Sequence, residues 1–368
     1  MIKRKLFLII SFCAISSCVV AQKAISYSDP SAAHKSHRVK TSARNSTKEF
    51  SRDTNVGLWT SMKDKNVFSH LDIAATLGTT GIGIDLSTPL GDYLQLRTGF
   101  SYMPRFEMNS GFRVQVGDSL DKKWDQNGNR LETKFDRLSG YLKSIVGYDV
   151  DDEVTMTCKP TYYNFKLLVD AFPFRDKRWH LTAGFFVGPS EIARAYNRTE
   201  EMPSLLSVSM WNMLYDKAKN WEPIYDDYFM PEMLENKLLQ YGRMGFHAGD
   251  YTHDGVDSKG NAYSKGDPYM MVPDEASGMV KAYIKVNRFK PYVGFGYGGA
   301  ISKDGLTQLS FDAGVMFWGG TPSMITHDGT NLTKDVENVK GKLGRYVDAA
   351  KFFTVFPMLE LRISRRIF

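Results

Sequence analysis

The residue types best suited to metal chemistry gather between His247 and Gly255. This stretch, His247-Ala-Gly-Asp-Tyr-Thr-His-Asp-Gly255, supplies two imidazoles and two carboxylates, which are ligand types that zinc accepts. The candidate ligands are His247, Asp250, His253 and Asp254. Neither helical nor hairpin spacing relates them, so we interpret the stretch as a solvated loop and predict no metal site.

A second polar stretch partly resembles a calcium-binding loop. Asp125, Asn127 and Asn129 alternate along the chain, as the first ligands of such a loop do. Arg130, however, stands where that loop needs a glycine for its sharp turn. Because the Asn127-Gly128 pair is typical of a hairpin turn, the sequence favours a turn over a calcium site.

No segment has the arrangement of a hydrolytic or nucleotide-binding site. The sequence contains neither a Gly-x-Ser-x-Gly nucleophile elbow nor a phosphate-binding loop, and the glycine-rich segment 79–83 lies in a predicted hairpin. His180 falls on the polar face of a strand-like segment beside a turn, and we interpret it as a polar lumen residue and not a catalytic one. We therefore predict no catalytic residue, no cofactor and no enzymatic activity.

The N-terminus has the features of an export signal. A basic head, residues 1–5, precedes the apolar residues 6–20, and Val19-Val-Ala21 offers small residues for cleavage. We predict a signal peptide over residues 1–21. Ile15-Ser-Ser-Cys18 loosely matches a lipoprotein signal, so a lipid anchor on Cys18 remains the alternative.

The predicted mature chain has few features that point to a soluble partner. Cleavage after Ala21 leaves Cys158 as the single cysteine, which rules out an intramolecular disulfide. Residues 22–65 are polar and rich in Ser, Lys and Arg, as in a flexible periplasmic leader. The net charge is +6, but the charges are mixed and form no basic stripe, so we predict no nucleic-acid partner.

Alternation of apolar and polar side chains with a period of two dominates residues 66–368, which indicates strands. The strand-like segments are 70–77, 81–89, 93–102, 163–171, 179–187, 280–286, 291–298, 307–317 and 355–368. The last segment ends in Phe368. The polar faces carry many charges, namely Asp72, Asp85, Arg97, Lys166, Asp170, Lys281, Lys285, Asp312, Glu360 and Arg362.

Charged faces of this kind suit the lumen of a transmembrane barrel, whose apolar faces meet lipid. The sequence thus predicts an all-β fold, a transmembrane antiparallel up-and-down β-barrel. The segments 89–92, 174–177 and 287–290 read as tight periplasmic turns, and 107–160 and 189–278 as long extracellular loops.

The strand count is the weak point of this topology. Nine segments alternate, but bacterial barrels usually have an even number of strands. We expect a periplasmic turn at 318–322, a tenth strand at 322–327 and a helical segment at 335–351 in a third outer loop. About ten strands are therefore favoured, with eight as the alternative if one hairpin lies outside the membrane.

Several segments together resemble the outer-membrane β-barrel domain proteins of Gram-negative bacteria, which are small porin-like barrels. They are Gly78-Thr-Thr-Gly-Ile-Gly-Ile-Asp85, Leu96-Arg-Thr-Gly99, Leu168-Val-Asp-Ala-Phe-Pro173, Lys290-Pro-Tyr-Val-Gly-Phe-Gly-Tyr-Gly298 and the C-terminal Phe368. The resemblance implies an integral protein of the cell outer membrane, surrounded by its lipid. It also implies assembly by the outer-membrane barrel assembly machinery through recognition of the C-terminal strand. It transfers no catalytic residue, because function in such barrels lies in the loops.

Two functions are consistent with this pattern. The first is a structural or surface-interaction role, in which loops 107–160 and 189–278 bind an extracellular ligand. The alternative is a small-solute channel, or a transport- or secretion-associated component, with a passage lined by Arg97, Lys166, Lys281 and Lys285.

Overall fold

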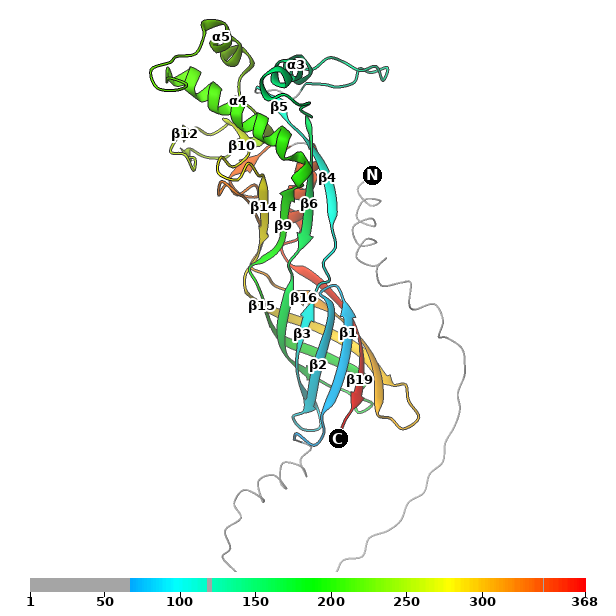
Figure 1. The fold of residues 1–368 in the computed structure, drawn as a ribbon. Coiled ribbons are helices and arrows are strands. Elements are labelled where there is room, and N and C mark those ends of the chain that lie inside the picture. Colours follow the sequence, from blue (N-terminus) through cyan, green and yellow to red (C-terminus); the bar gives the residue numbers. More distant parts are fainter. Residues whose placement is uncertain (1–66, 118–120, 340) are drawn as a thin grey trace, which may run out of the picture.

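The computed structural model describes residues 67–117, 121–339 and 341–368. The predicted signal peptide and the leader 22–65 lie outside these residues. Eight antiparallel strands form a closed up-and-down barrel, in which every strand pairs with its neighbours in chain order and the last pairs with the first (Figure 1). These strands are β1 (Asp72–Gly78), β2 (Gly81–Pro89), β3 (Leu94–Tyr102), β7 (Tyr163–Ala171), β8 (Trp179–Val187), β15 (Phe289–Ala300), β16 (Thr307–Met316) and β19 (Phe356–Arg366).

The alternation seen in the sequence sets the two faces of every barrel strand. Along β7, Phe165 and Val169 are exposed on the outside, whereas Lys166 and Asp170 are fully buried in the lumen. The same division holds in β19, where Leu359, Leu361 and Ile363 point outward. The barrel therefore carries an apolar outer surface around a polar interior, as the sequence predicts.

The connections differ sharply between the two ends of the barrel. At one end lie the short turns 90–93, 172–178 and 301–306, together with Phe368. At the other end a tight turn joins β1 to β2, and three long insertions follow β3, β8 and β16. The predicted short turns at 89–92 and 174–177 are confirmed, and loops 107–160 and 189–278 do emerge together at the opposite end.

The strand count of ten is not confirmed, since the barrel has the eight strands of the alternative. Segment 280–286 forms β14 (Lys281–Lys285), and segment 322–327 forms β17 (Ser323–Thr326). These two strands pair with each other outside the barrel. Segments 287–290 and 318–322 therefore do not lie with the short turns 89–92 and 174–177, because they are at the end of the barrel that carries the insertions. Alternation identifies a half-buried strand but not the sheet to which it belongs.

The three insertions fold together into one head above the barrel (Figure 1). Its main sheet has the order β17-β14-β9-β6-β4, and a smaller sheet has the order β13-β10-β18, with β5 also paired to β10. The remaining strands are β4 (Met108–Arg113), β5 (Gln115–Val116), β6 (Glu153–Pro160), β9 (Glu191–Asn197), β10 (Met244–Tyr251), β11 (Gly255–Val256), β12 (Ala262–Tyr263), β13 (Pro268–Met271) and β18 (Val336–Glu337).

Helices make the head an exception to the predicted all-β class. They are α3 (Lys134–Val146), the 3₁₀ turn η1 (Thr199–Glu201), α4 (Met202–Asn220), α5 (Glu232–Tyr241) and α6 (Gly341–Phe352). The helix expected at 335–351 corresponds to α6. None of the described helices is both long and apolar enough to span a bilayer.

Helix α4 is held to the smaller sheet by buried polar groups as well as by packing. The Trp211 indole donates to the carbonyl of Gly242 at 2.9 Å, and the Asn212 amide exchanges two hydrogen bonds with the Met244 backbone. The fully buried Leu205 and Leu238 belong to the same apolar cluster. The head therefore has a hydrophobic core of its own and is not a set of independent loops.

Candidate functional site

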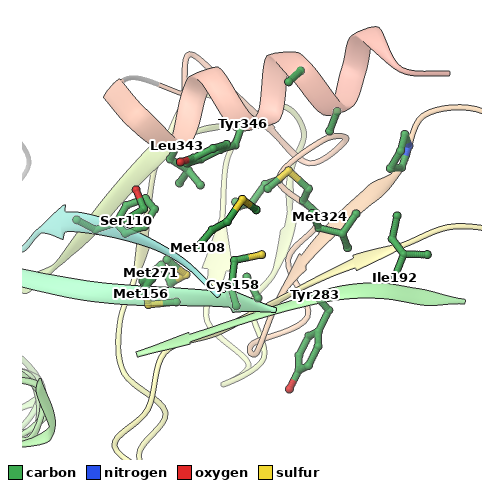
Figure 2. Close-up of a pocket in the computed structure, with 18 of the residues that line it drawn as sticks. Met108, Ser110, Met156, Cys158, Ile192, Met271, Tyr283, Met324, Leu343 and Tyr346 are labelled. Carbon is green, nitrogen blue, oxygen red and sulfur yellow. The ribbon is translucent and has the colours of Figure 1, made fainter. Parts of the chain in front are cut away.

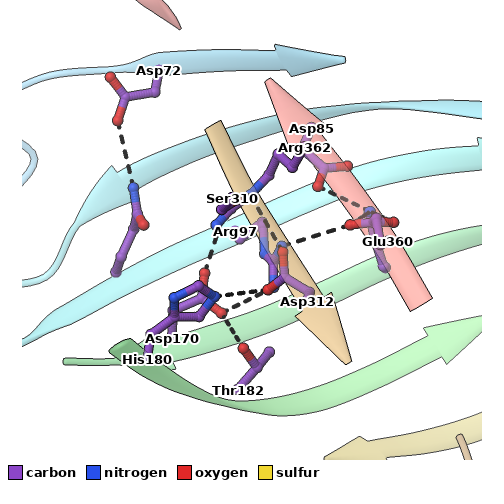
Figure 3. Close-up of polar contacts among 12 residues, drawn as sticks. Asp72, Asp85, Arg97, Asp170, His180, Thr182, Ser310, Asp312, Glu360 and Arg362 are labelled. Atoms are coloured by element: carbon purple, nitrogen blue, oxygen red, sulfur yellow. Dashed lines mark hydrogen bonds and ion pairs between the residues drawn. The ribbon is translucent and has the colours of Figure 1, made fainter. Parts of the chain in front are cut away.

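The barrel lumen contains a dense cluster of ionisable side chains, which we call the lumen cluster (Figure 3). Every barrel strand except β1 and β15 contributes a side chain to it. No side chain of the cluster exceeds 7% exposure. Its members are Asp85, Arg97, Lys166, Asp170, His180, Asp312, Glu360 and Arg362.

Arg97 lies at the centre of the lumen cluster. Its guanidinium is 3.0 Å from Asp170, 3.4 Å from Asp312 and 3.6 Å from Glu360. These carboxylates come from three different strands, so one side chain links β3 to β7, β16 and β19. Ion pairs buried this deeply hold their geometry only when each charge has partners.

The other two cations complete the network. The Lys166 ammonium lies 2.9 Å from Asp85 and 2.8 Å from Glu360. Arg362 donates to the Ser310 hydroxyl at 3.0 Å and faces Asp170 and Asp312 at 3.8 Å. Three cations thus meet four carboxylates, and His180 lies 2.7 Å from Asp312. The arrangement braces the barrel across its interior.

Apolar side chains close the lumen on the side of the head. Phe186 and Tyr292 pack edge-to-face at 5.5 Å, and the layer is completed by Leu168, Met316 and Met358. At the opposite end the lumen opens into a polar cavity of about 30 Å³ beside His180 and Arg362, roughly the volume of one water molecule. Side chains therefore fill the barrel interior, as expected for eight strands.

His180 lies where the sequence predicts it, on the lumen face, with Asp312 beside its ring. A histidine–carboxylate pair is half of a hydrolytic triad. Here Thr182 and the neighbouring carboxylates are buried as well, and the cavity that His180 lines measures about 30 Å³. Through its contact with Asp312, His180 links β8 to β16 inside the described barrel.

The metal candidates of the sequence do not converge. His247 lies 3.8 Å from Asp250, whereas His253 packs against the Tyr263 ring and Asp254 accepts from the backbone N–H of Lys265. Within residues 67–117, 121–339 and 341–368, no three His, Cys, Asp or Glu side chains are placed to share an ion.

The calcium-like stretch forms a turn. The Asp125 carboxylate accepts hydrogen bonds from the backbone N–H groups of Asn127 and Asn129, both at 2.8 Å. A carboxylate oxygen used in this way stabilises an Asx-type turn. The predicted preference for a turn is thus confirmed at this position.

Lys281 and Lys285 were expected in the lumen, and this placement is wrong. Both lie on β14 in the main sheet of the head, on its outer face. There the Lys285 ammonium lies 5.7 Å from the centre of the Tyr283 ring, and Arg194 approaches the same ring from β9. Of the four cations proposed to line a passage, only Arg97 and Lys166 are in the barrel.

Sequence reasoning missed an apolar cavity between α6 and the main sheet of the head (Figure 2). Its volume is about 340 Å³. Alternate residues of β4, β6 and β14 form its floor, and α6 forms its roof. The floor residues include Met108, Ser110, Phe112, Met156, Cys158, Ala282 and Ile284. The alternation Met108-x-Ser110-x-Phe112 could have indicated that β4 is a strand with one face turned toward an apolar space.

Cys158 points into this cavity (Figure 2). It is the only cysteine among the described residues. Burial raises the pKa of its thiol, so Cys158 stays protonated near neutral pH and is a weak nucleophile.

Exposed aromatic side chains gather at the tip of the head, in the connection between α4 and α5. Trp221 and Tyr225 are 73% and 80% exposed, and Tyr228 and Phe229 are exposed beside them. Trp221 adopts a positive φ of 57° as the left-handed C-cap of α4, and Asp226 has a φ of 49°. We call Trp221, Tyr225, Tyr228 and Phe229 the aromatic tip.

Comparisons with known proteins give distant likenesses. No protein-family model matches the sequence, and no curated protein is similar to it. The chain is similar to the crystal structures of Acinetobacter baumannii CarO2 and CarO, with 11% identity to each. These likenesses cover 81% and 80% of this chain and 98% and 97% of theirs, with TM-scores of 0.32 and 0.33.

A major outer membrane protein of Thermus thermophilus is also similar, at 11% identity over 81% of this chain and 98% of that protein, with a TM-score of 0.21. At such scores the likenesses carry no argument about fold or function. The barrel rests instead on the strand pairing described above.

Proposed function

We propose that this protein is an integral outer-membrane barrel that anchors a folded head on the cell surface, where the head makes interactions with other molecules. The observation that carries the proposal is the joint folding of all three long insertions at one end of a barrel whose lumen is filled. Short turns and both ends of the barrel chain lie at the other end. In outer-membrane barrels the short turns are periplasmic and the long loops extracellular.

The outer surface of the barrel supports membrane insertion. Large apolar side chains are exposed on all its strands, among them Ile84, Phe100, Leu181, Phe295 and Leu361. Soluble monomers rarely expose a continuous apolar surface of this extent. Lipid of the outer membrane is the proposed environment, and a cleaved signal peptide the proposed route of export.

The final strand is the proposed element for recognition by the barrel assembly machinery. In the closed barrel β19 pairs with β16 on one edge and with β1 on the other. Its backbone groups are then occupied, so recognition of β19 has to precede closure.

The filled lumen weighs against the alternative of a small-solute channel. Arg97 and Lys166 are held by carboxylates and cannot line an open passage without breaking buried ion pairs, which costs several kcal/mol. The aromatic tip instead offers the kind of residues that dominate binding at protein interfaces. The proposed contact surface is therefore the head.

The decisive test combines location with conductance. Membrane-extracted protein should migrate faster on SDS gels before boiling than after it, and protease added to intact cells should cut only within 103–162, 188–288 or 317–355. In planar bilayers we expect no stable conductance. A steady single-channel current would favour the channel, and the absence of both the mobility shift and surface cleavage would contradict the membrane barrel.

The contact surface needs its own test. A photo-crosslinking amino acid in place of Tyr225 should give cross-linked products on intact cells, whereas the same amino acid in place of Asp304, in the short turn at the opposite end, should not. Equal products from both sites, or none from Tyr225, would remove the aromatic tip from the proposal.

A further inference from the structure

We propose that the cavity between α6 and the main sheet binds the alkyl chain of a single-chain amphiphile with an anionic head group, such as a fatty acid. This inference concerns the head alone and does not depend on whether the barrel conducts. Only the supply of the ligand from the membrane rests on the proposed outer-membrane location.

The lining excludes polar ligands from the interior of the cavity. Apart from Ser110, Cys158 and three aromatic side chains that carry a polar atom, the wall is hydrocarbon and thioether. The Trp318 indole is already used, since it donates to the carbonyl of Phe353 at 3.1 Å. A volume of about 340 Å³ lies near the lower limit of known small-molecule sites, roughly 300–1,000 Å³. An apolar cavity of this size attracts an apolar ligand rather than water.

The shape of the cavity favours a chain over a compact ring system. The wall runs along α6 from Leu343 (Figure 2) and ends at Phe353, just beyond the helix. At about 1.5 Å per residue, this part of the helix is roughly 15 Å long. A cavity of modest volume drawn out along a helix is narrow, and an extended alkyl chain fits such a space.

One end of the cavity is closed. Trp318, only 7% exposed, packs against Phe356 with 5.2 Å between the ring centres. The hydrogen bond from the Trp318 indole to the Phe353 carbonyl fixes the Trp318 ring at the C-terminal end of α6, next to the barrel. The methyl end of a chain would reach this wall.

The other end opens between α6 and the edge strand β4. Met108 and Tyr346, both in the wall, are 45% and 50% exposed. Ser110 lies beside them, and the Lys342 ammonium donates to the neighbouring Gly111 carbonyl at 3.2 Å. An exposed ammonium at an otherwise apolar opening complements an anionic head group.

The charges around the opening agree with this assignment. Arg345 and Lys351 are also exposed on α6, with Asp348 as the one acidic residue of that helix. Glu107, the residue before Met108, pairs with Lys159 at 2.6 Å. Glu153 lies across from Arg113 on the opposite face of the sheet. A carboxylate at the opening thus meets cations.

Methionines give the wall its adaptability. Met108, Met156, Met271 and Met324 all contribute to it. Their unbranched, polarisable side chains fill irregular space and adjust to different partners. We expect the site to accept alkyl chains of several lengths.

Cys158 supplies a direct readout of occupancy. The full mature chain, placed in phosphatidylcholine nanodiscs, is treated with a maleimide in the presence and absence of sodium laurate. Laurate should slow modification of Cys158 by at least about tenfold, because a bound chain covers the thiol. An equal rate with and without laurate, with no lipid found on the protein by native mass spectrometry, overturns the proposal.

Two sources of an alkyl chain are distinguished in the same experiment. If Cys158 is protected before laurate is added, and native mass spectrometry finds a nanodisc lipid bound, the chain comes from the membrane. If protection requires laurate, it comes from a free amphiphile. Loss of the barrel itself would appear as loss of the heat-induced gel shift, independently of either result.

Matched substitutions locate the effect. Ala349→Phe and Ala282→Phe each place a ring in the cavity and should abolish protection by laurate, whereas Asp348→Phe, on the exposed side of α6, should retain it.

Lys342→Gln should weaken laurate binding by at most about fivefold, the effect of an exposed ion pair, and leave dodecanol binding unchanged. Full protection in both cavity variants, with the gel shift intact, would overturn the proposal.

Discussion

Arg97 contacts three buried carboxylates from three strands, so its removal leaves several negative charges without a partner. We expect Arg97→Met to destabilise the barrel by about 3–5 kcal/mol, the usual cost of breaking a buried ion pair from one side. The temperature at which the fast-migrating band disappears from unboiled gels would measure the loss.

Arg365 provides the control for this substitution. It is exposed on β19 and bonds to the Thr307 hydroxyl at 3.2 Å. Arg365→Met should change stability by less than about 0.5 kcal/mol. Equal midpoints for the Arg97 and Arg365 variants would mean that the lumen cluster contributes no net stability.

At the level of single residues, the sequence predicted the lumen well and the head poorly. Asp85, Arg97, Lys166 and Asp312 lie inside the barrel as their alternation indicated. Lys281 does not, although its segment alternates just as clearly. Alternation of charged and apolar residues along a strand shows that one face is buried. The charged face can then lie either in a barrel lumen or on the solvated side of a sheet.

Among the elements, strand β8 depends on a close approach that only glycine permits. A Cβ on Gly184 would lie 2.7 Å from the Cα of Leu168 on β7 and would also meet the Leu167 carbonyl. Gly184→Ala should therefore cost about 1–3 kcal/mol through overpacking, measured as a lower urea midpoint in liposomes.

Gly299, on β15, is the matched position, because a Cβ there meets nothing within 4 Å. Gly299→Ala should leave the midpoint unchanged. Equal urea midpoints for Gly184→Ala and Gly299→Ala would contradict the prediction.

Helix α3 begins with a reciprocal cap that makes its stability pH-dependent. Partial burial raises the pKa of Asp136, but hydrogen bonds from the backbone N–H and hydroxyl of Thr133, with Arg130 nearby, bring it below its ordinary value. A lowered folded-state pKa gives stability that is complete above the unfolded value, about 3.9, and is lost as the pH falls below it.

We therefore expect hydrogen-exchange protection of α3 to decrease as the pH falls through about 4, and Thr133→Ala to cost about 1 kcal/mol at neutral pH. Asp136→Asn should flatten the pH dependence. A profile for that variant identical to the wild type would assign the acid sensitivity to other carboxylates.

The elements of the head were beyond prediction because their pairing is not local. Strands β4 and β6 lie within one insertion, but β9, β14 and β17 reach them from farther along the chain. Short strands of this kind, such as β17, carry too few residues for alternation to reveal partners. The cavity beneath α6 depends on this pairing and could not be foreseen either.

For the whole molecule, the proposed orientation makes a direct prediction. In a Cys158→Ser background, Tyr225→Cys should react with a membrane-impermeant maleimide on intact cells, because the aromatic tip would face outward. Asp304→Cys, in the turn between β15 and β16, should react only after the outer membrane is permeabilised. The reverse pattern would place the head in the periplasm.

The main sheet of the head takes β4 and β6 from the first insertion, β9 and β14 from the second and β17 from the third. No contiguous stretch of the gene encodes it. A single recombination event therefore cannot transfer the head to another barrel, and a deletion within any one insertion removes strands on which the other two depend. Head and barrel should be inherited as one unit, and variation among descendants should accumulate in surface residues such as the aromatic tip, without exchange of the head as a module.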